Sequence, residues 1–347
     1  MNEILFFIIV KVITVIAVFA GIMLAVAYST LFERKFASFF QDRVGPNRSW
    51  FFGILQPMAD GLKFFFKEDM IPFNTHKALF FTAPILAFVA SFAIIAFVPF
   101  GDHIVLFGEN IYFEIMNSNI SLLLVLAFSS LTVFGYMLGG WASNNKYSML
   151  GGLRSSSQMI SYELAMGISL IGVILIANTL NLRNLVEYQI ENYWFIVSQP
   201  LGFFIFLVTT FAECSRTPFD LPEAENELVG GYHTEYSSFK FSLFQLAEYG
   251  HLVTASLIMA VIFLGGWDIP FVDLSGFNPI VVGLLGVIAI VAKTAAFIFL
   301  FMWVRWTIPR FRYDQIQRIG WKVLLPLALI NLVATMLWNA DWVVNWK

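Results

Sequence analysis

Residues 4–32 read ILFFIIVKVITVIAVFAGIMLAVAYSTLF, and this stretch decides the fold class. Its only charged residue is Lys11. At 1.5 Å per residue, a helix of this length spans about 42 Å, more than the roughly 30 Å hydrocarbon core of a bilayer. The stretch therefore predicts a transmembrane helix that tilts in the membrane or protrudes from it.

Seven further apolar stretches are long enough to cross a bilayer: 79–98, 120–140, 157–180, 193–212, 243–266, 279–306 and 321–338. Hydrophobic residues make up 59% of the 347 residues and charged residues only 12%, about half the roughly 25% of soluble domains. We find no internal repeat and no separate soluble segment. The sequence predicts an all-α protein, a polytopic bundle of eight transmembrane helices in one membrane domain, 1–347.

Lysine and arginine fall almost entirely on one side of the predicted bundle. Sixteen of them lie in or beside the first, third, fifth and seventh loops, against two, Arg183 and Lys347, on the other side. Because cytoplasmic loops carry such an excess, these four loops should be cytoplasmic and both termini should lie outside.

The fifth loop is acidic, where a membrane protein normally carries bases. Residues 212–236, AECSRTPFDLPEAENELVGGYHTEY, hold one cation, Arg216, and six carboxylates: Glu213, Asp220, Glu223, Glu225, Glu227 and Glu235. Asp220 and Glu223 fit the start of a helix, with an aspartate cap and an acid three residues on. Capping explains only these two acids.

Three carboxylates are expected at matched depth within the membrane. Glu163 and Glu248 lie about six and five residues into their spans, and Glu213 ends the span before the acidic loop. Carboxylates in lipid are costly and commonly mark proton or ion pathways. The alternative is that each acid extends its carboxylate to the membrane interface or forms a structural hydrogen bond to a neighbouring helix. That alternative explains less well why three acids lie at the same depth. His251 shares a helix face with Glu248 and fits either a relay or an interhelical hydrogen bond.

The first loop predicts an amphipathic helix lying on the membrane surface. In WFFGILQPMADGLKFFFKE (50–68), apolar residues recur at helical spacing: Phe51, Leu55, Met58, Leu62 and Phe65. Polar residues recur on the opposite face: Gln56, Asp60, Lys63 and Lys67. Such a helix lies in the membrane interface, where it either anchors the loop or walls a portal for a lipid-like substrate.

The chain shows no visible means of carrying an electron. Cys214 is the only cysteine, which excludes a thiolate iron–sulfur cluster or zinc site within the chain. There is no glycine-rich dinucleotide fingerprint, phosphate loop or nucleophile elbow. A net charge of −3 gives no argument for a nucleic-acid partner. The sequence predicts no metal site and no cofactor bound by this chain alone.

Four stretches closely resemble the H subunit of bacterial respiratory complex I, whose mitochondrial counterpart is NADH dehydrogenase subunit 1. They are ERKFASFFQDRVGPNR (33–48), QPMADGLKFFFKE (56–68), GWASNNKYSMLGGLRSSSQMISYE (140–163) and AECSRTPFDLPEAENELVGGYHTEYS (212–237). The resemblance runs in order along essentially the whole chain. It implies a subunit of a translocase, proton-pumping NADH:quinone oxidoreductase, in a bacterial plasma membrane or, if organellar, the inner mitochondrial membrane.

The resemblance also implies roles for individual residues. Quinone would enter from the bilayer beside the interfacial helix and reach a chamber shared with peripheral subunits, near Arg34, Ala59, Asp60 and Arg216. An acidic chain from this chamber into the membrane arm would comprise Glu163, Glu213, Glu223, Glu225, Glu227 and Glu248. The chain itself would be non-redox and inactive alone. Flavin mononucleotide and iron–sulfur clusters would sit on partner subunits, with other membrane-arm subunits and lipid as neighbours.

Three alternatives to this interpretation differ in what they require of the sequence. Related membrane subunits also serve membrane-bound hydrogenases, but the complete first- and fifth-loop motifs favour the quinone enzyme. An independent proton-coupled transporter would be expected to show repeated halves with interrupted helices, which this sequence lacks. A purely structural anchor would not account for the buried acids. Two departures from the family pattern, Ser38 and His233, leave the acids untouched.

Overall fold

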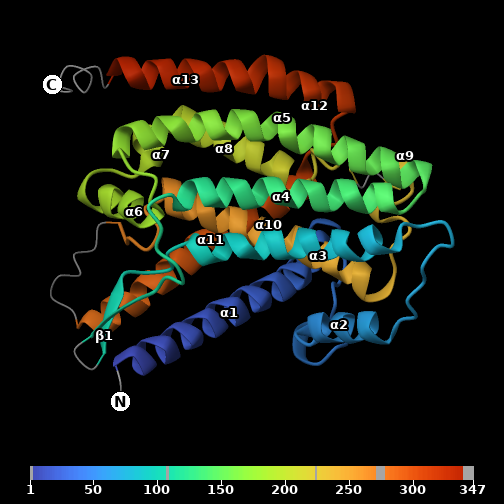
Figure 1. Cartoon of the computed structure of the whole chain (residues 1–347), viewed down its shortest axis with the longest axis horizontal. Coiled ribbons are helices and arrows are strands. Elements are labelled where there is room, and N and C mark those ends of the chain that lie inside the picture. The colour runs from blue at the N-terminus through green and yellow to red at the C-terminus, as the bar shows by residue number, and fades with distance from the viewer. Residues whose placement is uncertain (1–2, 107–108, 223–224, 271–277, 339–347) are drawn as a thin grey trace.

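Helices form nearly all of the regular structure in the computed structural model of the chain (Figure 1). The structure describes residues 3–106, 109–222, 225–270 and 278–338. Within these ranges, seven helical segments are long and apolar enough to cross a membrane. They are α1 (Glu3–Phe40), α3 (Lys77–Ala93) continued by the 3-10 turn Ile94–Phe97, α4 (Ser121–Ala142), α5 (Lys146–Ala177), α10 (Ser238–Phe263), α11 (Pro279–Thr307) and a continuous run of α12 (Tyr313–Ile319), a π-helical turn (Gly320–Leu324) and α13 (Leu325–Trp338). The prediction of a helical membrane protein is confirmed.

The fifth predicted span, 193–212, differs from the others. It is divided between α7 (Phe195–Ser198) and α8 (Pro200–Glu213), with Gln199 between them. Proline has no backbone N–H to continue the preceding turn, so a new helix begins at Pro200. α8 has 14 residues, which gives about 21 Å at 1.5 Å per residue, shorter than the core of a bilayer.

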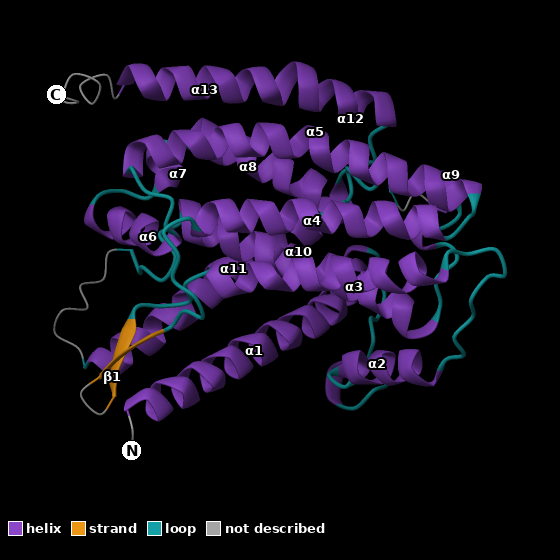
Figure 2. Cartoon of the chain, viewed as in Figure 1, coloured by secondary structure: helices purple, strands orange, loops and turns teal. Residues whose placement is uncertain are grey.

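The shorter elements gather at the two ends of the bundle (Figures 1 and 2). One end carries α2 (Gln56–Phe66) and α9 (Glu225–Leu228), from the first and fifth loops. The opposite end carries α6 (Leu182–Glu191) and an antiparallel hairpin of β1 (His103–Leu106) and β2 (Glu109–Tyr112), which no pattern in the sequence predicted. α1 begins and α13 ends at this second end. Short 3-10 turns are formed by Phe51–Gly53, Ile94–Phe97 and Gly231–His233.

α10 is the central helix of the bundle. In the most apolar 18-residue stretch of α10, 83% of the residues are buried inside the protein, whereas the corresponding share for α1 is 6%. α10 packs against α1, α3 and α11, while α5 packs against α4, α8 and α13. The close approach of α3 and α4 depends on Gly135, because a Cβ there would lie 2.7 Å from that of Ala87. Polar side chains on α10 therefore face protein more than lipid.

Lys293 on α11 binds backbone carbonyl groups at the C-terminal end of α10. Its Nζ donates to the carbonyl oxygens of Leu264, Gly266 and Asp268, at 2.6, 3.0 and 2.5 Å. Leu264 is the C-cap residue of α10, whose carbonyl lacks a partner within the helix, and Gly266 and Asp268 lie in the segment that follows. Lys293 thus caps the C-terminal end of α10 and holds the segment after it.

Replacing Lys293 with methionine should destabilise the protein by about 1–3 kcal/mol, because buried carbonyl groups lose their donor. Thermal unfolding and hydrogen–deuterium exchange across 258–270 measure the effect. Lys322→Met, at an exposed lysine, is the matched control. Equal unfolding midpoints for the two variants would contradict the capping role.

Candidate functional site

Arg216 occupies the centre of a buried ion cluster. It follows α8 after a turn at Ser215, whose φ of +49° lies in the left-handed region. Its Nη1 lies 3.1 Å from Oε2 of Glu33, and its Nε lies 3.0 Å from Oε1 of Glu248. The guanidinium also lies 4.3 Å from the ring centroid of Tyr249. Only 3% of Arg216 is exposed, so these protein groups replace most of its water.

Glu33 joins distant segments of the chain at this cluster. Besides its contact with Arg216, it accepts hydrogen bonds from the Tyr249 hydroxyl at 2.7 Å and from Nη1 of Arg305. α1, α10, α11 and the fifth loop therefore meet here. Neither Glu33 nor Arg305 was predicted as a site residue, because each ends an apolar stretch and resembles an ordinary charge at a membrane boundary. The one available signal was the position of Glu33 at the start of the ERK motif.

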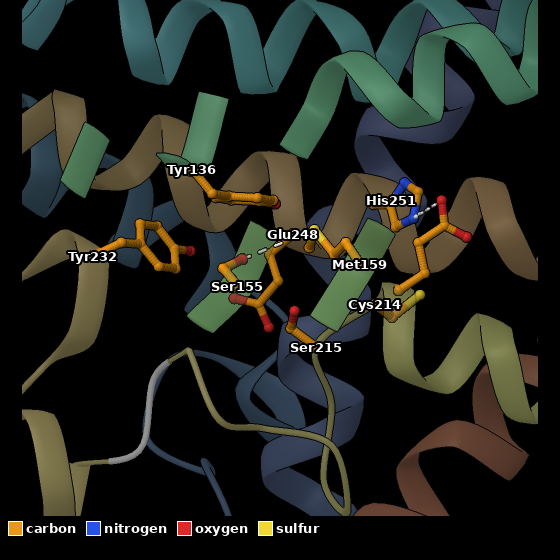
Figure 3. A pocket seen from close by; sticks show the side chains of 9 residues that line it. Tyr136, Ser155, Met159, Cys214, Ser215, Tyr232, Glu248 and His251 are labelled. Carbon is orange, nitrogen blue, oxygen red and sulfur yellow. Dashed lines mark hydrogen bonds and ion pairs between the residues drawn. The ribbon is translucent and has the colours of Figure 1, made fainter. Parts of the chain in front are cut away.

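Glu213 and His251 form the neighbouring part of the site. Oε1 of Glu213 lies 3.6 Å from Nε2 of His251. With Glu248, both residues line an internal cavity of about 10 Å³ (Figure 3). Its other lining residues are Tyr136, Ser155, Met159, Cys214, Ser215 and Tyr232. The cavity matches the volume that one water molecule needs, so it can link the two carboxylates through water.

Glu163 lies at the edge of this site. Ser130 on α4 donates a hydrogen bond to its Oε1, and the carboxylate is close enough to Glu213 and His251 for their charges to interact. The side chain also lines an open groove of about 440 Å³ formed by α4 and α5, whose other residues are mainly leucine and isoleucine. The three acids expected inside the membrane thus lie in one region, with Glu163 outside the cavity.

Asp220 pairs with a cation from a distant segment of the chain. Its Oδ2 accepts a hydrogen bond from Nη2 of Arg310 at 2.7 Å. The helix start that Asp220 and Glu223 fit by spacing falls on residues 223–224, outside the described residues, so capping stays a prediction. Tertiary packing supplies this cation from the segment after α11, and the ion pair fixes the acidic loop there.

Other acids of the fifth loop hold it against α5. Oε2 of Glu227 lies 2.5 Å from Nη1 of Arg154. Oε1 of Glu235 accepts a hydrogen bond from Asn145, the N-cap of α5, at 2.6 Å. Glu223 and the side chain of Glu225 lie outside the described residues.

Arg34, Ala59 and Asp60 form a separate group on α1 and α2. Nη1 of Arg34 lies 2.6 Å from Oδ2 of Asp60, with about half of the arginine side chain exposed. Gln56 donates to the other oxygen of Asp60 at 3.0 Å, and Ala59 is exposed. The structure therefore pairs two of the predicted chamber residues but places Arg216 in a different, buried cluster.

α2 exposes its apolar face and is tied to α10 at one end. None of its residues is buried, and the predicted apolar set is exposed: Phe51, Leu55, Met58, Leu62 and Phe65. The Ser238 hydroxyl donates to the carbonyl oxygens of Phe64 and Lys67, at 3.1 and 2.8 Å. The end of α2 is thereby fixed to the start of the helix that carries Glu248.

The arrangement places carboxylates with different partners in one connected region. Glu33 binds two arginines, Glu248 binds Arg216, and Glu213 lies beside His251. A change of charge near Arg216 would therefore alter the electrostatic stabilisation of Glu248, which shares a water-sized cavity with Glu213. The described residues contain no cluster of three or more potential metal ligands.

Known proteins match the chain along most of its length. The profile of the NADH dehydrogenase family matches residues 13–336. An NADH-quinone oxidoreductase H subunit of Cytophaga hutchinsonii is 49% identical over 329 residues, covering 95% of this chain and 96% of the relative. The NADH-quinone oxidoreductase H subunit of Flavobacterium johnsoniae is 47% identical over 333 residues, covering 95% of each chain. The resemblance seen in the loop motifs is confirmed, and the chain belongs to the NADH dehydrogenase family.

Proposed function

We propose that the chain is the membrane subunit that couples quinone reduction to proton translocation in an NADH-quinone oxidoreductase of the complex I type. Its relatives bear the name of this enzyme's H subunit. The observation that best supports coupling is the 3.0 Å contact between Arg216 and Glu248, together with the cavity that Glu248 shares with Glu213. The contact therefore joins the fifth loop, which carries Arg216, to α10 inside the bundle, which carries Glu248.

Quinone would be reduced beside the first and fifth loops, in a chamber shared with peripheral subunits. Arg34, Ala59, Asp60 and Arg216 would form its membrane side. Electrons would come from flavin mononucleotide and iron–sulfur clusters on partner subunits, and this chain would remain non-redox and inactive alone. Its contribution would be electrostatic, since uptake of electrons and protons by quinone changes the charge that Arg216 experiences.

The carboxylates would pass this change into the membrane. When the charge balance around Arg216 shifts, the protonation of Glu248 shifts with it, and the shared cavity allows exchange with Glu213. Glu163 would continue the route towards neighbouring membrane-arm subunits. In the fifth loop, the route would begin at Glu223, Glu225 and Glu227.

The membrane arrangement that accompanies this function has eight crossings in one domain. α7 and α8 together would make the eighth, and α2 would lie in the interface with its exposed apolar side chains towards lipid. The end with α2 and α9 would be cytoplasmic, and both termini periplasmic, in a bacterial plasma membrane. An even number of crossings is supported by the shared end at which α1 begins and α13 ends (Figure 1).

Purification from native membranes tests the proposed function. Flavin and iron–sulfur subunits should co-purify, and the complex should reduce quinone with NADH and pump protons in vesicles. A chain that purifies alone would favour an independent transporter, and hydrogen evolution would favour a hydrogenase. Cross-links to peripheral subunits should fall in the first and fifth loops, whereas cross-links to 100–119 or 267–278 would contradict the orientation.

Replacing Ala59 with phenylalanine should raise the apparent KM for long-tailed quinones roughly tenfold, because added bulk narrows the proposed portal. The side chain is exposed, so folding should change little. Steady-state assays with quinones of different tail length provide the measurement. Ala78→Phe, at an exposed alanine of α3, is the control, and an unchanged KM for long-tailed quinones in an intact Ala59→Phe complex would count against the portal.

A further inference from the structure

His251 is buried in α10 with neither ring nitrogen hydrogen-bonded. The residue is 5% exposed, and among the described residues Nδ1 and Nε2 have no hydrogen-bond partner. Oε1 of Glu213 lies 3.6 Å from Nε2, beyond ordinary hydrogen-bond range. Buried polar atoms are almost always satisfied by protein or by ordered water. The surroundings of this imidazole should therefore provide sites for water.

Two internal cavities meet at His251. The first, of about 10 Å³, also borders Glu248, and the second, of about 20 Å³, extends to Ser129 on α4. Among the described residues, Glu213 and His251 are the two that line both cavities. A group at this junction can contact the contents of both.

Each cavity has the volume and the polar groups for one water molecule. A buried water needs about 10–15 Å³ and two to four polar partners. In the first cavity, the Ser215 hydroxyl oxygen has no hydrogen-bond partner among the described residues. In the second, the hydroxyls of Ser129 and Thr210 donate to their own helices, so their lone pairs remain to accept from water.

We propose that His251 transfers protons between a water molecule in the first cavity and one in the second, and so connects Glu248 to the interior of the bundle. This proposal rests on the proposed function and adds a proton carrier that is not a carboxylate.

No lysine or arginine among the described residues lines either cavity. Neither cavity therefore places a fixed positive charge against an imidazolium. The titratable groups bordering His251 are Glu213, Cys214, Glu248, Tyr136 and Tyr232, with the charge of Glu163 in range.

The transfer needs no reactant besides these groups. The carboxyl group of Glu248 gives a proton to the first water while that water gives one to a ring nitrogen, which leaves a carboxylate, an unchanged water and an imidazolium. The other ring nitrogen gives its proton to the second water while that water gives one to the carboxylate of Glu213, which leaves a neutral ring and an unchanged water. Each step breaks one O–H or N–H bond and forms another, so charge and protons balance. Glu213, which lines both cavities, can exchange the proton that returns the ring to its starting tautomer.

His251→Gln in the assembled complex tests the proposal. Glutamine keeps hydrogen-bonding groups for both waters but cannot be protonated at neutral pH. Pumping and quinone-linked turnover should fall at least tenfold, with the KM for quinone unchanged. Ser256→Ala is the control, because Ser256 is a buried polar residue of the same helix, and its hydroxyl donates to the carbonyl oxygen of Leu252 within α10. Pumping of His251→Gln at the wild-type rate would overturn the proposal.

A density map of the wild-type complex supplies a readout independent of activity. Ordered water within hydrogen-bond distance of both ring nitrogens is expected, and density that excludes water from either cavity would overturn the proposal. His251→Asn serves as a second variant, and loss of assembly in both variants would assign His251 a structural role instead. A wild-type complex that binds these waters but shows no quinone-linked pumping would contradict the proposed function, not the water sites.

Discussion

Replacing Arg216 with methionine is expected to destabilise the protein by about 3–5 kcal/mol, because removing one partner from a buried ion pair leaves a charge uncompensated. Glu248 loses a guanidinium 3.0 Å away, and Glu33 loses one of its two arginines. Side-chain exposures of 4% for Arg216, 6% for Glu33 and 12% for Glu248 leave little water to replace the lost contacts.

Cys214 provides the measurement of this effect. It is the only cysteine in the sequence, is free, and is 2% exposed, so a thiol reagent reaches it only when this region opens. Mass spectrometry of its peptide along a temperature ramp gives a labelling midpoint within the assembled complex. Arg312→Met is the control, because its pair with Asp314 is exposed and worth about 0–1 kcal/mol. If both variants were labelled at the same temperature, the ion cluster would not stabilise the fold.

Glu213→Gln and Glu248→Gln should each lower quinone-linked proton pumping by about 100-fold or more while the complex still assembles. A glutamine keeps the size and a hydrogen-bond acceptor, so a carboxylate that only braces helices is replaceable by it. A carboxylate that gains and loses a proton in each turnover is not. Pumping and turnover are measured in vesicles for each variant.

Assembly separates this effect from a folding defect. Burial of an ionised acid in the membrane costs about 2.5–3.5 kcal/mol on insertion scales, so removing the charge should leave stability unchanged or slightly improved. Arg216 still has Glu33 as a partner in Glu248→Gln. Glu187→Gln, at an acid with about half of its side chain exposed, is the control. Normal pumping in both variants would contradict the hypothesis that these two acids relay protons. Loss of assembly would indicate that the acids have a structural role.

The positions of the long helices followed from the apolar stretches, but their lengths did not. α5 begins at Lys146 and α10 at Ser238, well before the predicted spans at 157 and 243. Hydropathy identifies only the apolar part of a helix. The backbone hydrogen bonds of the helix continue into polar residues on either side, which hydropathy does not detect. The division of 193–212 into α7 and α8 follows from Pro200, which cannot continue the preceding helical turn. Hydropathy averaged over the span does not register this interruption.

The acids of the candidate site were selected from the sequence, but their partners were not. Glu213 and Glu248 were predicted to lie at matched depth in the membrane, and in the structure they line one cavity. By spacing, Asp220 fits the start of a helix, and the structure adds a partner that spacing did not suggest, Arg310. Local spacing specifies capping, whereas a buried ion pair joins residues that packing brings together.

The sequence alone determined that the chain crosses a membrane, which loops carry its cations, and which acids lie within apolar helices. Each of these properties depends on side chains summed along a local stretch. Only the tertiary structure decided which charges meet, since Glu33 lies 183 positions from Arg216 and 272 positions from Arg305. A salt bridge requires atoms within about 4 Å, so its partners are set by how α1, α10 and α11 pack, which no local pattern of residues encodes.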